Sequence, residues 1–582
     1  MRLFGTQIAF LLLFLCILSA PSVSAAPVRI ATSNFTVSSQ TSVEFVDAVT
    51  ADDGALFVLT EGLLAGQRKL TLIRYSVDGI RTWSRTLDFP WSTSSRPVAM
   101  KAASLLAVPG GKVLVLSSRG TPIDVPSAEI DMVARVYSPA GAQLAARGIA
   151  PIIKSTFGAE CSVFAGHAIM AQDGQIWVLA SVKDGSGLEG AFLIRFSAGL
   201  DVGATRFLRG GIEDFFGEEI TTTGWAGAGL APNVGSGVIA TLRTKLLFWN
   251  GSFESSSSVA TYAISNGGGT SFLTDDGDSL DNDTLFRFGE GFDQATSGAN
   301  HLTSFAPVSR NSLTFMGCDL GVDFSGTVLD FQANSYGTGL EIEAVPGGKF
   351  LVAGYEPTFG GGHYLAWGEP NLSSPVPFEQ AETLLLPLVG PSGWVLSSLR
   401  TDTQGTGYLA GGPTVGGKES IGISVYYDPT ASFIKAGITW QLTNSSGTFS
   451  AKRILPTAQN RVFAVGVNPA GVVGVQLFQQ PTYYRGITLN ATALVRGATG
   501  YYKLSLAAPA PAGGYRVAMT ASSSRFSGIP SVVTVPEGAT FVEGSFTVRA
   551  SAPLGDTTIT TRVDSRYDTV NAIHTATANI SD

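Results

Sequence analysis

A short phrase recurs along most of this chain, and its cleanest copy is Ala344–Tyr355, AVPGGKFLVAGY. The phrase joins a turn, marked by Pro-Gly-Gly, to a short apolar run that follows at once. Glycine adopts the positive φ that a tight hairpin turn needs, and the run after it has the composition of a strand. Each copy therefore predicts a β-hairpin, and its recurrence predicts a repeat protein.

Seven further segments carry the phrase in looser form. They are Ala51–Leu59, Val108–Leu116, Ala171–Ala180, Ala231–Thr241, Ala306–Gly317, Leu388–Leu396 and Leu455–Gly466. A second phrase, an alternating run that ends in another turn, follows several of them. It is clearest at Thr71–Gly79, Met132–Gly141, Phe192–Asp201 and Ile421–Pro429. Alternation of this kind puts one face of a strand inward and the other outward.

Together the two phrases give each unit about four strands, and no helical period of any length interrupts them. Repeated four-stranded antiparallel units are what a β-propeller is built from. The last unit stops one strand short after Val472–Phe478, and Val28–Phe35 is the segment that can complete it and close the ring. A linear β-solenoid and a string of small sandwiches are the alternatives. Solenoid coils are usually shorter than these units, and sandwich domains are longer, at about 100 residues.

The phrase disappears from about Tyr484, and seven short runs with strand composition replace it. They are Ile487–Leu494, Tyr501–Leu506, Tyr515–Thr520, Ser531–Val535, Phe541–Val548, Thr557–Val563 and Ile573–Ile580. That number of strands and their spacing are typical of an immunoglobulin-like sandwich. The sequence thus predicts an all-β chain: a seven- or eight-bladed β-propeller over residues 27–482, then an Ig-like β-sandwich over residues 483–582.

Two segments, PGGKFLVAG at Pro346–Gly354 and FLIRFSAGLD at Phe192–Asp201, resemble the bacterial delta-60 repeat, which is found in exported propeller-like proteins. The resemblance covers much of Ala51–Phe478, although most copies lack the Phe-Gly ending typical of that repeat. It implies a propeller and no established chemistry, so it provides no catalytic residues to carry over. Ser531–Ala550 resembles the Ig-like modules appended to many bacterial surface proteins, which implies adhesion or spacing work.

The first residues, Met1–Ala26, have the features of a secretory signal peptide. Arg2 provides the positive charge, Ile8–Leu18 the apolar core, and Val23–Ala26 the small residues of a cleavage site. The core is shorter than the roughly 20 residues that a spanning helix needs, which favours a cleaved leader over an uncleaved membrane anchor. We therefore expect an exported protein that is periplasmic, extracellular or at the cell surface, with no membrane span in the mature chain.

The charge of the chain limits its partners. The formal net charge is -8, and no run of Lys or Arg is longer than two residues. Phosphate binding needs clustered basic side chains, so nucleic acid is excluded as a partner. In an exported chain Cys161 and Cys318 can form a disulfide. They are far apart in non-adjacent units, so two buried thiols are the favoured alternative.

The acidic segment Asp275–Asp283, DDGDSLDND, is the densest group of potential metal ligands. Its alternately spaced carboxylates are Asp276, Asp278, Asp281 and Asp283. Calcium loops use such spacing, but Leu280 stands where an EF-hand needs an oxygen ligand and no glutamate closes the loop. The sequence favours a solvated loop, with a calcium site at the four aspartates as the alternative. No other cofactor is indicated.

The remaining candidates for chemistry are weak. The histidines, His167, His301, His363 and His574, lack partners at the spacing of zinc ligands. No G-x-S-x-G elbow is present. The carboxylates of Glu213-Asp214 and Glu218-Glu219 flank a short turn, where an exposed loop is favoured over an acid–base pair. We assign no catalytic and no cofactor-binding residue.

These observations favour an exported, non-enzymatic scaffold or binding protein that attaches to a surface or binds a protein or glycan through its propeller loops. Propellers place variable loops around a common scaffold, and loops carry the function. The alternative is an exported hydrolase or lyase whose site is assembled at the mouth of the propeller channel from several blades. A structural spacer with no ligand is the third hypothesis.

Overall fold

The computed structural model describes residues 28–582, with gaps of eight residues or more at 92–102, 120–130, 276–292, 306–313, 330–340, 369–383, 386–393, 442–450 and 564–572 and with shorter gaps elsewhere. The described chain forms two compact units. One contains Arg29–Ala458 and Val462–Phe478, and the other contains Gln479–Asp582. The expected leader, Met1–Ala26, lies outside the described residues.

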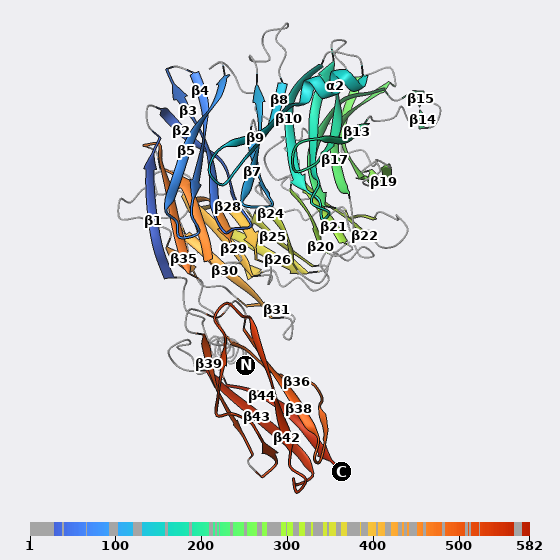
Figure 1. Ribbon diagram of the computed structural model, residues 1–582. Coiled ribbons are helices and arrows are strands. Elements are labelled where there is room, and N and C mark those ends of the chain that lie inside the picture. Colours follow the sequence, from blue (N-terminus) through green and yellow to red (C-terminus); the bar gives the residue numbers. More distant parts are fainter. Residues whose placement is uncertain are drawn as a thin grey trace, which may run out of the picture. The chain divides into compact units, whose positions relative to one another are not determined.

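Apart from one two-stranded hairpin, the described residues of the first unit form eight sheets of four or five strands that follow one another along the chain (Figure 1). Sheet 1 holds β2 (Thr41–Thr50), β3 (Leu56–Leu64), β4 (Gln67–Tyr75) and β5 (Arg81–Trp91); sheet 2 holds β6 (Ala103–Val108), β7 (Lys112–Arg119), β8 (Asp131–Tyr137) and β9 (Gln143–Gly148); sheet 3 holds β10 (Cys161–Met170), β11 (Ile176–Asp184), β12 (Glu189–Phe196) and β13 (Val202–Leu208). Sheet 4 holds β16 (Thr221–Pro232), β17 (Val238–Trp249), β18 (Phe253–Ile264) and β19 (Thr270–Asp275); sheet 5 holds β20 (Asp293–Ser297), β21 (Asn300–Phe305), β22 (Thr314–Asp319) and β23 (Thr327–Leu329); sheet 6 holds β24 (Glu341–Val345), β25 (Lys349–Glu356), β26 (Gly362–Gly368) and β27 (Leu384–Leu385). Sheet 7 holds β28 (Trp394–Thr401), β29 (Gly407–Pro413), β30 (Ile421–Asp428), β31 (Phe433–Lys435) and β32 (Thr439–Gln441), and sheet 8 holds β33 (Ala451–Pro456), β34 (Arg461–Val467), β35 (Val472–Gln479) and β1 (Val28–Thr36).

The sheets close into a ring through their first strands, which we call the innermost strands. Each packs against the innermost strand of the next sheet, in the order β2, β6, β10, β16, β20, β24, β28, β33, and β33 packs against β2. This closure is that of a β-propeller, so the predicted all-β propeller class is confirmed. Strand β1 pairs with β35 and completes sheet 8, as predicted for Val28–Phe35.

Six of the eight copies of the hairpin phrase lie where expected, at the turn between the first and second strands of a sheet. The other two were placed wrongly. Ala306–Gly317 lies between β21 and β22, the second and third strands of sheet 5, and Leu388–Leu396 runs into β28, an innermost strand. Glycine and proline mark a turn without specifying which connection it makes, so the turn signal alone could not identify the strand that follows.

One helix was not predicted. Helix α2 (Ile149–Phe157) follows β9 directly, whereas the sequence showed no helical period in the repeat units. Ile149 and Ile153, one turn apart, are buried against the core between sheets 2 and 3, and the hydroxyls of Ser155 and Thr156 donate to the Ile152 carbonyl. Two core positions are too few to give a recognisable helical period.

The cores of the propeller lie between neighbouring sheets. Between sheets 8 and 1, for example, Val58 and Ile73 pack with Phe463, Val465 and Val475, all buried. The residues that alternate with Val58 and Ile73 along β3 and β4, such as Phe57 and Leu72, pack toward sheet 2 instead. Strands β3 and β4 are therefore apolar on both faces. Burial of apolar surface between sheets is the main driving force that holds such a ring together.

Tyr75 ends strand β4 with a hydroxyl that is buried and has no hydrogen-bond partner among the described residues. Burial also raises the pKa of this hydroxyl. An unpaired buried hydroxyl costs free energy of folding. Sheet 3 has a phenylalanine, Phe196, at the equivalent position, so the propeller accepts a side chain without the hydroxyl there. We expect Tyr75→Phe to leave the propeller as stable or to stabilise it by about 1 kcal/mol. Urea unfolding followed by tryptophan fluorescence measures this, because all eight tryptophans precede residue 479.

A matched control for that substitution is Tyr484→Phe in the second unit. The Tyr484 hydroxyl donates to Thr561 Oγ1 at 2.9 Å, so its removal takes a donor away from a buried hydroxyl, which keeps only its own bond to the His574 carbonyl. We expect a loss of about 1 kcal/mol there, measured by calorimetry of the second unit. A loss of stability in Tyr75→Phe as large as in Tyr484→Phe would contradict the assignment of Tyr75 as unpaired.

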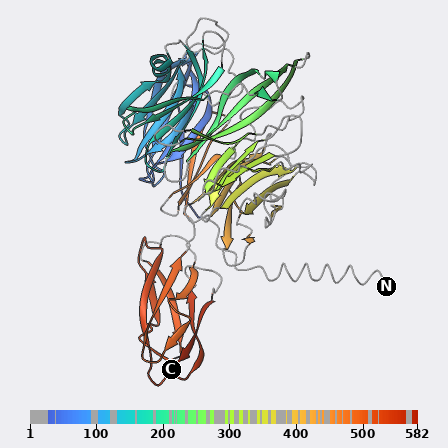
Figure 2. The same ribbon diagram turned by 90° about the vertical axis from the view of Figure 1, so that its right-hand side faces the viewer.

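The second unit is a two-sheet sandwich (Figure 2). One sheet has the order β36 (Tyr484–Leu489), β38 (Thr499–Leu506), β42 (Phe541–Val548), β40 (Phe526–Ser527), and the other β37 (Ala493–Val495), β44 (Ile573–Ser581), β43 (Gly555–Val563), β39 (Tyr515–Ala521), β41 (Val532–Val535). Inward-facing side chains of both sheets form one core. The segment predicted as one strand, Ile487–Leu494, is two, because the chain leaves the first sheet after Leu489 and joins the second.

Two cross-strand pairs at the centre of this core each join a glycine to an aromatic ring. Gly500 on β38 lies opposite Phe546 on β42, and Gly544 on β42 lies opposite Tyr502 on β38. A Cβ atom at either glycine would run into the facing ring. The rings therefore occupy the space that the glycines leave open, in the manner of aromatic rescue.

Candidate functional site

The structure does not describe the acidic segment that the sequence singled out. Asp276, Asp278, Asp281 and Asp283 lie in the gap that follows β19, so the calcium site stays a prediction. Among the described residues, no group of three or more His, Cys, Asp or Glu side chains is placed to hold a metal ion. In the same part of the chain, no helix has the length and apolar character required to cross a bilayer.

The other sequence candidates are distributed over separate elements. Asp214 and Glu218–Glu219 form a small hairpin, β14 (Asp214–Phe215) with β15 (Glu218–Glu219), in which Asp214 pairs with Glu219. Cys161 begins β10 in sheet 3, whereas Cys318 lies on β22 in sheet 5. The backbone thus places the two cysteines in sheets that are not neighbours in the ring.

His574, the histidine of the second unit, packs against other residues of the sandwich. Its ring meets the ring of Tyr484 edge to face, with centroids 5.0 Å apart. Gly486 lies against the same imidazole. This arrangement is a packing contact between the two sheets of the sandwich.

Asp47, on innermost strand β2, is a buried carboxylate with polar contacts in three sheets. It is 8% exposed. Its Oδ2 accepts the Leu105 amide of β6 at 2.9 Å, and its Oδ1 accepts the amide of Ala48 at 2.9 Å. The Arg453 guanidinium of β33 lies 3.6 Å from the same Oδ1. One side chain therefore links sheets 8, 1 and 2 around the centre of the ring.

Sheets 6, 7 and 8 are joined by similar contacts between innermost strands. Arg400 on β28 makes an ion pair of 2.7 Å with Glu343 on β24. Ser398 Oγ accepts the Ile454 amide of β33 at 3.2 Å, as Asp47 accepts that of Leu105. Thr401 Oγ1 donates to the Ala344 carbonyl at 2.9 Å. These polar groups bind the backbone or side chain of the adjacent sheet.

A shift in register explains why polar side chains of the innermost strands reach the next sheet. In sheets 1, 7 and 8 the pairing of the first two strands slips by one residue just before Asp47, Ser398 and Arg453. Such bulges re-aim side chains and bend the strand. Asp47, Ser398 and Arg453 each follow such a shift and each make one of the contacts described above, whereas Glu343 lies in a pairing without a shift.

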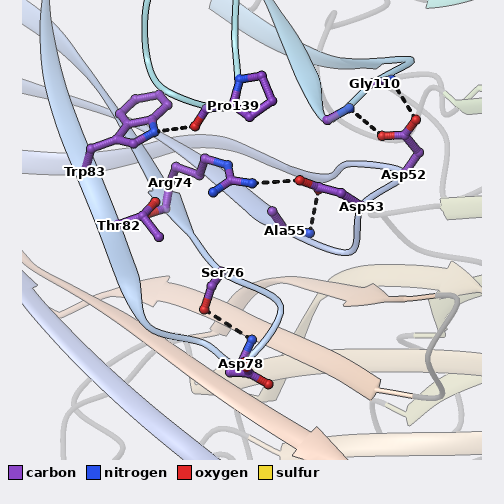
Figure 3. A network of polar contacts seen from close by, with 11 residues as sticks. Asp52, Asp53, Ala55, Arg74, Ser76, Asp78, Thr82, Trp83, Gly110 and Pro139 are labelled. Atoms are coloured by element: carbon purple, nitrogen blue, oxygen red, sulfur yellow. Dashed lines mark hydrogen bonds and ion pairs between the residues drawn. The ribbon is translucent and has the colours of Figure 1, made fainter.

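A second polar network joins sheets 1 and 2 at their turns (Figure 3). Asp53, in the β2–β3 turn, accepts the Ala55 amide and forms an ion pair with Arg74 at 2.7 Å. The indole of Trp83 donates to the carbonyl of Pro139 in sheet 2 at 2.8 Å. Arg74 stands at the place in the second phrase that Arg135 and Arg195 take in two other copies. Through its ion pair with Asp53, Arg74 stabilises the β2–β3 turn of sheet 1.

Asp52 fills an anion-binding turn of the neighbouring sheet. Its two carboxylate oxygens accept the amides of Gly110 and Gly111 at 2.7 and 2.6 Å. Both glycines have positive φ, a conformation that points successive amides at one anion. The amide hydrogen bonds from Gly110 and Gly111 hold the pKa of Asp52 below its usual value of 3.8.

This contact makes the stability of the propeller depend on pH in a defined direction. We expect Asp52→Asn to lose about 1 kcal/mol at pH 7, a modest value because the site is exposed. The unfolded carboxyl binds protons first, so the advantage of the wild type is lost as pH falls from about 4 through the lowered folded pKa. Urea unfolding at pH 7 and pH 3 measures the two differences. An equal difference at both values would contradict the linkage.

Side chains of one sheet also fit closely against turn residues of the next sheet. Trp83 of sheet 1 covers Gly141, the positive-φ residue of the β8–β9 turn, so closely that a Cβ atom there would lie 3.2 Å from the indole ring. At the next junction Ala145 takes the place of the tryptophan, and Leu200, also with positive φ, takes the place of the glycine. At the first junction the large residue is thus on the outer strand, and at the second it is in the turn.

Sequence reasoning missed Asp47, Ser398 and the ion pair of Glu343 with Arg400. The available signal was a charged residue among apolar neighbours in a strand, as at Asp47 between Val46 and Ala48, although Glu44 in the same run gives a similar signal and is exposed. Its partners lie on other sheets and depend on the closure of the ring. Two carboxylates of the described innermost strands, Asp47 and Glu343, each lie within ion-pair distance of a guanidinium group across a junction.

Comparison with known proteins yields no family model and no curated protein that matches this chain. Solved structures do match it. The β-propeller domain of the Trilobed protease from Pyrococcus furiosus matches with a TM-score of 0.36 and 8% identity over 69% of this chain and 98% of that chain. The WD40 domain of SCAP from fission yeast matches with a TM-score of 0.34 and 12% identity over 77% of this chain and 98% of that chain. The polysaccharide lyase Uly1 matches with a TM-score of 0.36 and 9% identity over 79% of this chain and 100% of that chain. At these values none of them indicates an activity or a ligand for this chain.

Proposed function

We propose that this chain is an exported binding or scaffold protein without catalytic activity, which attaches to a surface or binds a protein or glycan through the loops of its propeller. The observation that carries the proposal is that charged side chains of the innermost strands make contacts with neighbouring sheets. Asp47, Arg453, Glu343 and Arg400 are engaged across sheet junctions, where they hold the ring. A reacting group has to be able to exchange protons or bonds with a substrate, and these side chains are committed to structure.

The second unit supports a role in spacing or adhesion. We propose that it is an Ig-like module. In that fold one sheet has the order A-B-E and the other G-F-C. Strands β36-β38-β42 and β44-β43-β39 follow these orders, and β37 pairs in parallel with β44. These features, together with the expected leader peptide, support export to a surface.

The decisive experiment is to incubate the purified full chain with an array of purified polysaccharides and with a cell-surface extract. We expect saturable retention of at least one component and no formation of reducing ends, unsaturated sugars or ester cleavage products. Reproducible turnover would overturn the proposal and favour the alternative, an exported hydrolase or lyase with a site at the channel mouth. A chain that binds nothing in either assay would favour a spacer.

The calcium site at Asp276, Asp278, Asp281 and Asp283 is a separate proposal. Four carboxylates in one loop repel one another, so a bound calcium ion would order the loop and protect it. We expect limited proteolysis within 276–292 to slow when calcium is added, with magnesium as the control. The replacement of all four aspartates by asparagine should abolish the difference. Equal cleavage with and without calcium would leave the loop solvated.

A further inference from the structure

Strand β1, the outer strand of sheet 8, is attached to its sheet differently from the outer strands of sheets 1, 2 and 3. Strands β5, β9 and β13 each follow the third strand of their own sheet through a tight hydrogen-bonded turn, at 76–80, 138–142 and 197–201. Strand β1 pairs with β35, to which no turn connects it. Along the chain it continues only into β2 of sheet 1, through residues 37–40. Its place in sheet 8 therefore depends on non-covalent contacts alone.

Those contacts are shallow. From Arg29 to Thr36 the side chains alternate between exposed and half-buried, and none is buried. Ala31 and Phe35 pack on the margin of the core between sheets 8 and 1, and the Arg81 guanidinium lies 4.0 Å from the centroid of the Phe35 ring. Strand β35, in contrast, contributes several fully buried side chains to the cores. Removal of β1 would thus uncover one backbone edge and little apolar surface.

The closure of the ring does not depend on β1. Sheets 8 and 1 also meet through Asp47 with Arg453 at 3.6 Å, and through Thr50 Oγ1, which donates to the Pro456 carbonyl at 3.4 Å. Their shared core contains buried residues of β3, β4, β34 and β35. In addition, Gly471 in the β34–β35 turn lies against Val43 of β2. The ring and the strand that completes its last sheet are therefore separable.

We propose that the outer edge of β35 is a strand-acceptor site, which β1 fills within one chain and which Val28–Thr36 of a second copy fills in a dimer formed by strand exchange. Main-chain hydrogen bonds provide most of the affinity of such added strands, and alternate side chains provide specificity. The second copy fits because its strand has the same sequence, so its Phe35 packs beside Arg81 of the acceptor. Exchange of an identical element is a low-cost route to a dimer.

The test uses a full chain that lacks only Val28–Thr36 and a fluorescent peptide with the sequence VRIATSNFT. We expect the tryptophan fluorescence of the truncated chain to show a folded propeller, and the peptide to bind it saturably. A peptide with Phe35→Ala should bind about tenfold more weakly, and an acceptor with Arg81→Ala about threefold more weakly. The matched control is an Ile30→Ala peptide, because Ile30 is 46% exposed and should contribute little.

A second arm uses the intact chain. Two pools with different fluorescent labels are mixed at high concentration, with and without mild urea, and energy transfer is followed with size-exclusion chromatography. We expect urea to speed the appearance of mixed dimers, and an excess of the peptide to suppress them. A truncated chain that is unfolded, a folded one that does not bind the peptide, or an intact chain that never forms mixed dimers would each overturn the proposal.

Discussion

Asp47→Ala is expected to cost the propeller about 3 kcal/mol, a larger effect than that of Asp52→Asn. The change removes the acceptor of two amide hydrogen bonds, from Leu105 and Ala48, in a place that water reaches poorly. It also leaves the Arg453 guanidinium without the carboxylate 3.6 Å away. Buried groups that lose their partner cost more than the net value of the original bond, which is why the estimate exceeds that for Asp52.

Urea unfolding followed by tryptophan fluorescence measures the effect. Asp47→Asn keeps one acceptor oxygen and should lose about half as much. The matched control is Glu44→Gln, an exposed carboxylate on the same strand, for which we expect less than about 0.5 kcal/mol. If Asp47→Ala and Glu44→Gln were equally mild, the contacts across sheets 8, 1 and 2 would have no energetic role.

Gly544→Val is expected to destabilise the sandwich by about 3 kcal/mol or more. The new side chain would meet the ring of Tyr502, which is buried in the core of the sandwich. Either the ring leaves its place, which opens a cavity, or β38 and β42 separate. The reciprocal change, Gly500→Val, meets Phe546 in the same way and should have a similar cost.

The control lies one residue further along the strand. Ser545→Val places the same side chain on the exposed face of β42, where β-branched residues are well tolerated, and should change stability by less than about 0.5 kcal/mol. Calorimetry and hydrogen exchange of Gln479–Asp582 measure both variants. Because each unit has its own cores, the tryptophan-detected transition of the propeller should stay unchanged. Equal stability of Gly544→Val and Ser545→Val would contradict the role of the paired rings.

The all-β propeller class was predictable because its signals are local. Gly54, Gly111 and Gly174 mark hairpin turns with positive φ, and an apolar run on either side of a turn defines two paired strands. The missing strand of sheet 8 could be inferred because the last repeat was incomplete. Local signals failed where several turns share the same chemistry, as at Ala306–Gly317, and where an element was as short as α2.

The polar contacts of the candidate site were not predictable for a different reason. The partner of Asp47 is an amide of β6, and that of Arg400 is a carboxylate of β24. Neither partner is near in sequence, and both become neighbours only when the sheets form a ring. The bulges that aim these side chains depend on strand pairing as well. A sequence pattern records which face a residue occupies, but not which sheet lies opposite.

The pairing of β1 with β35 sets the order in which the propeller can be completed during synthesis. Sheet 8 needs the first strand of the unit and its last, so the nascent chain holds β1 without its partner until nearly the whole propeller has emerged. The contact that ends the process spans the longest loop in the unit, and contacts of that range form slowly. The time needed to synthesise the chain from β1 to β35 is therefore a lower limit on the time that β1 spends unpaired.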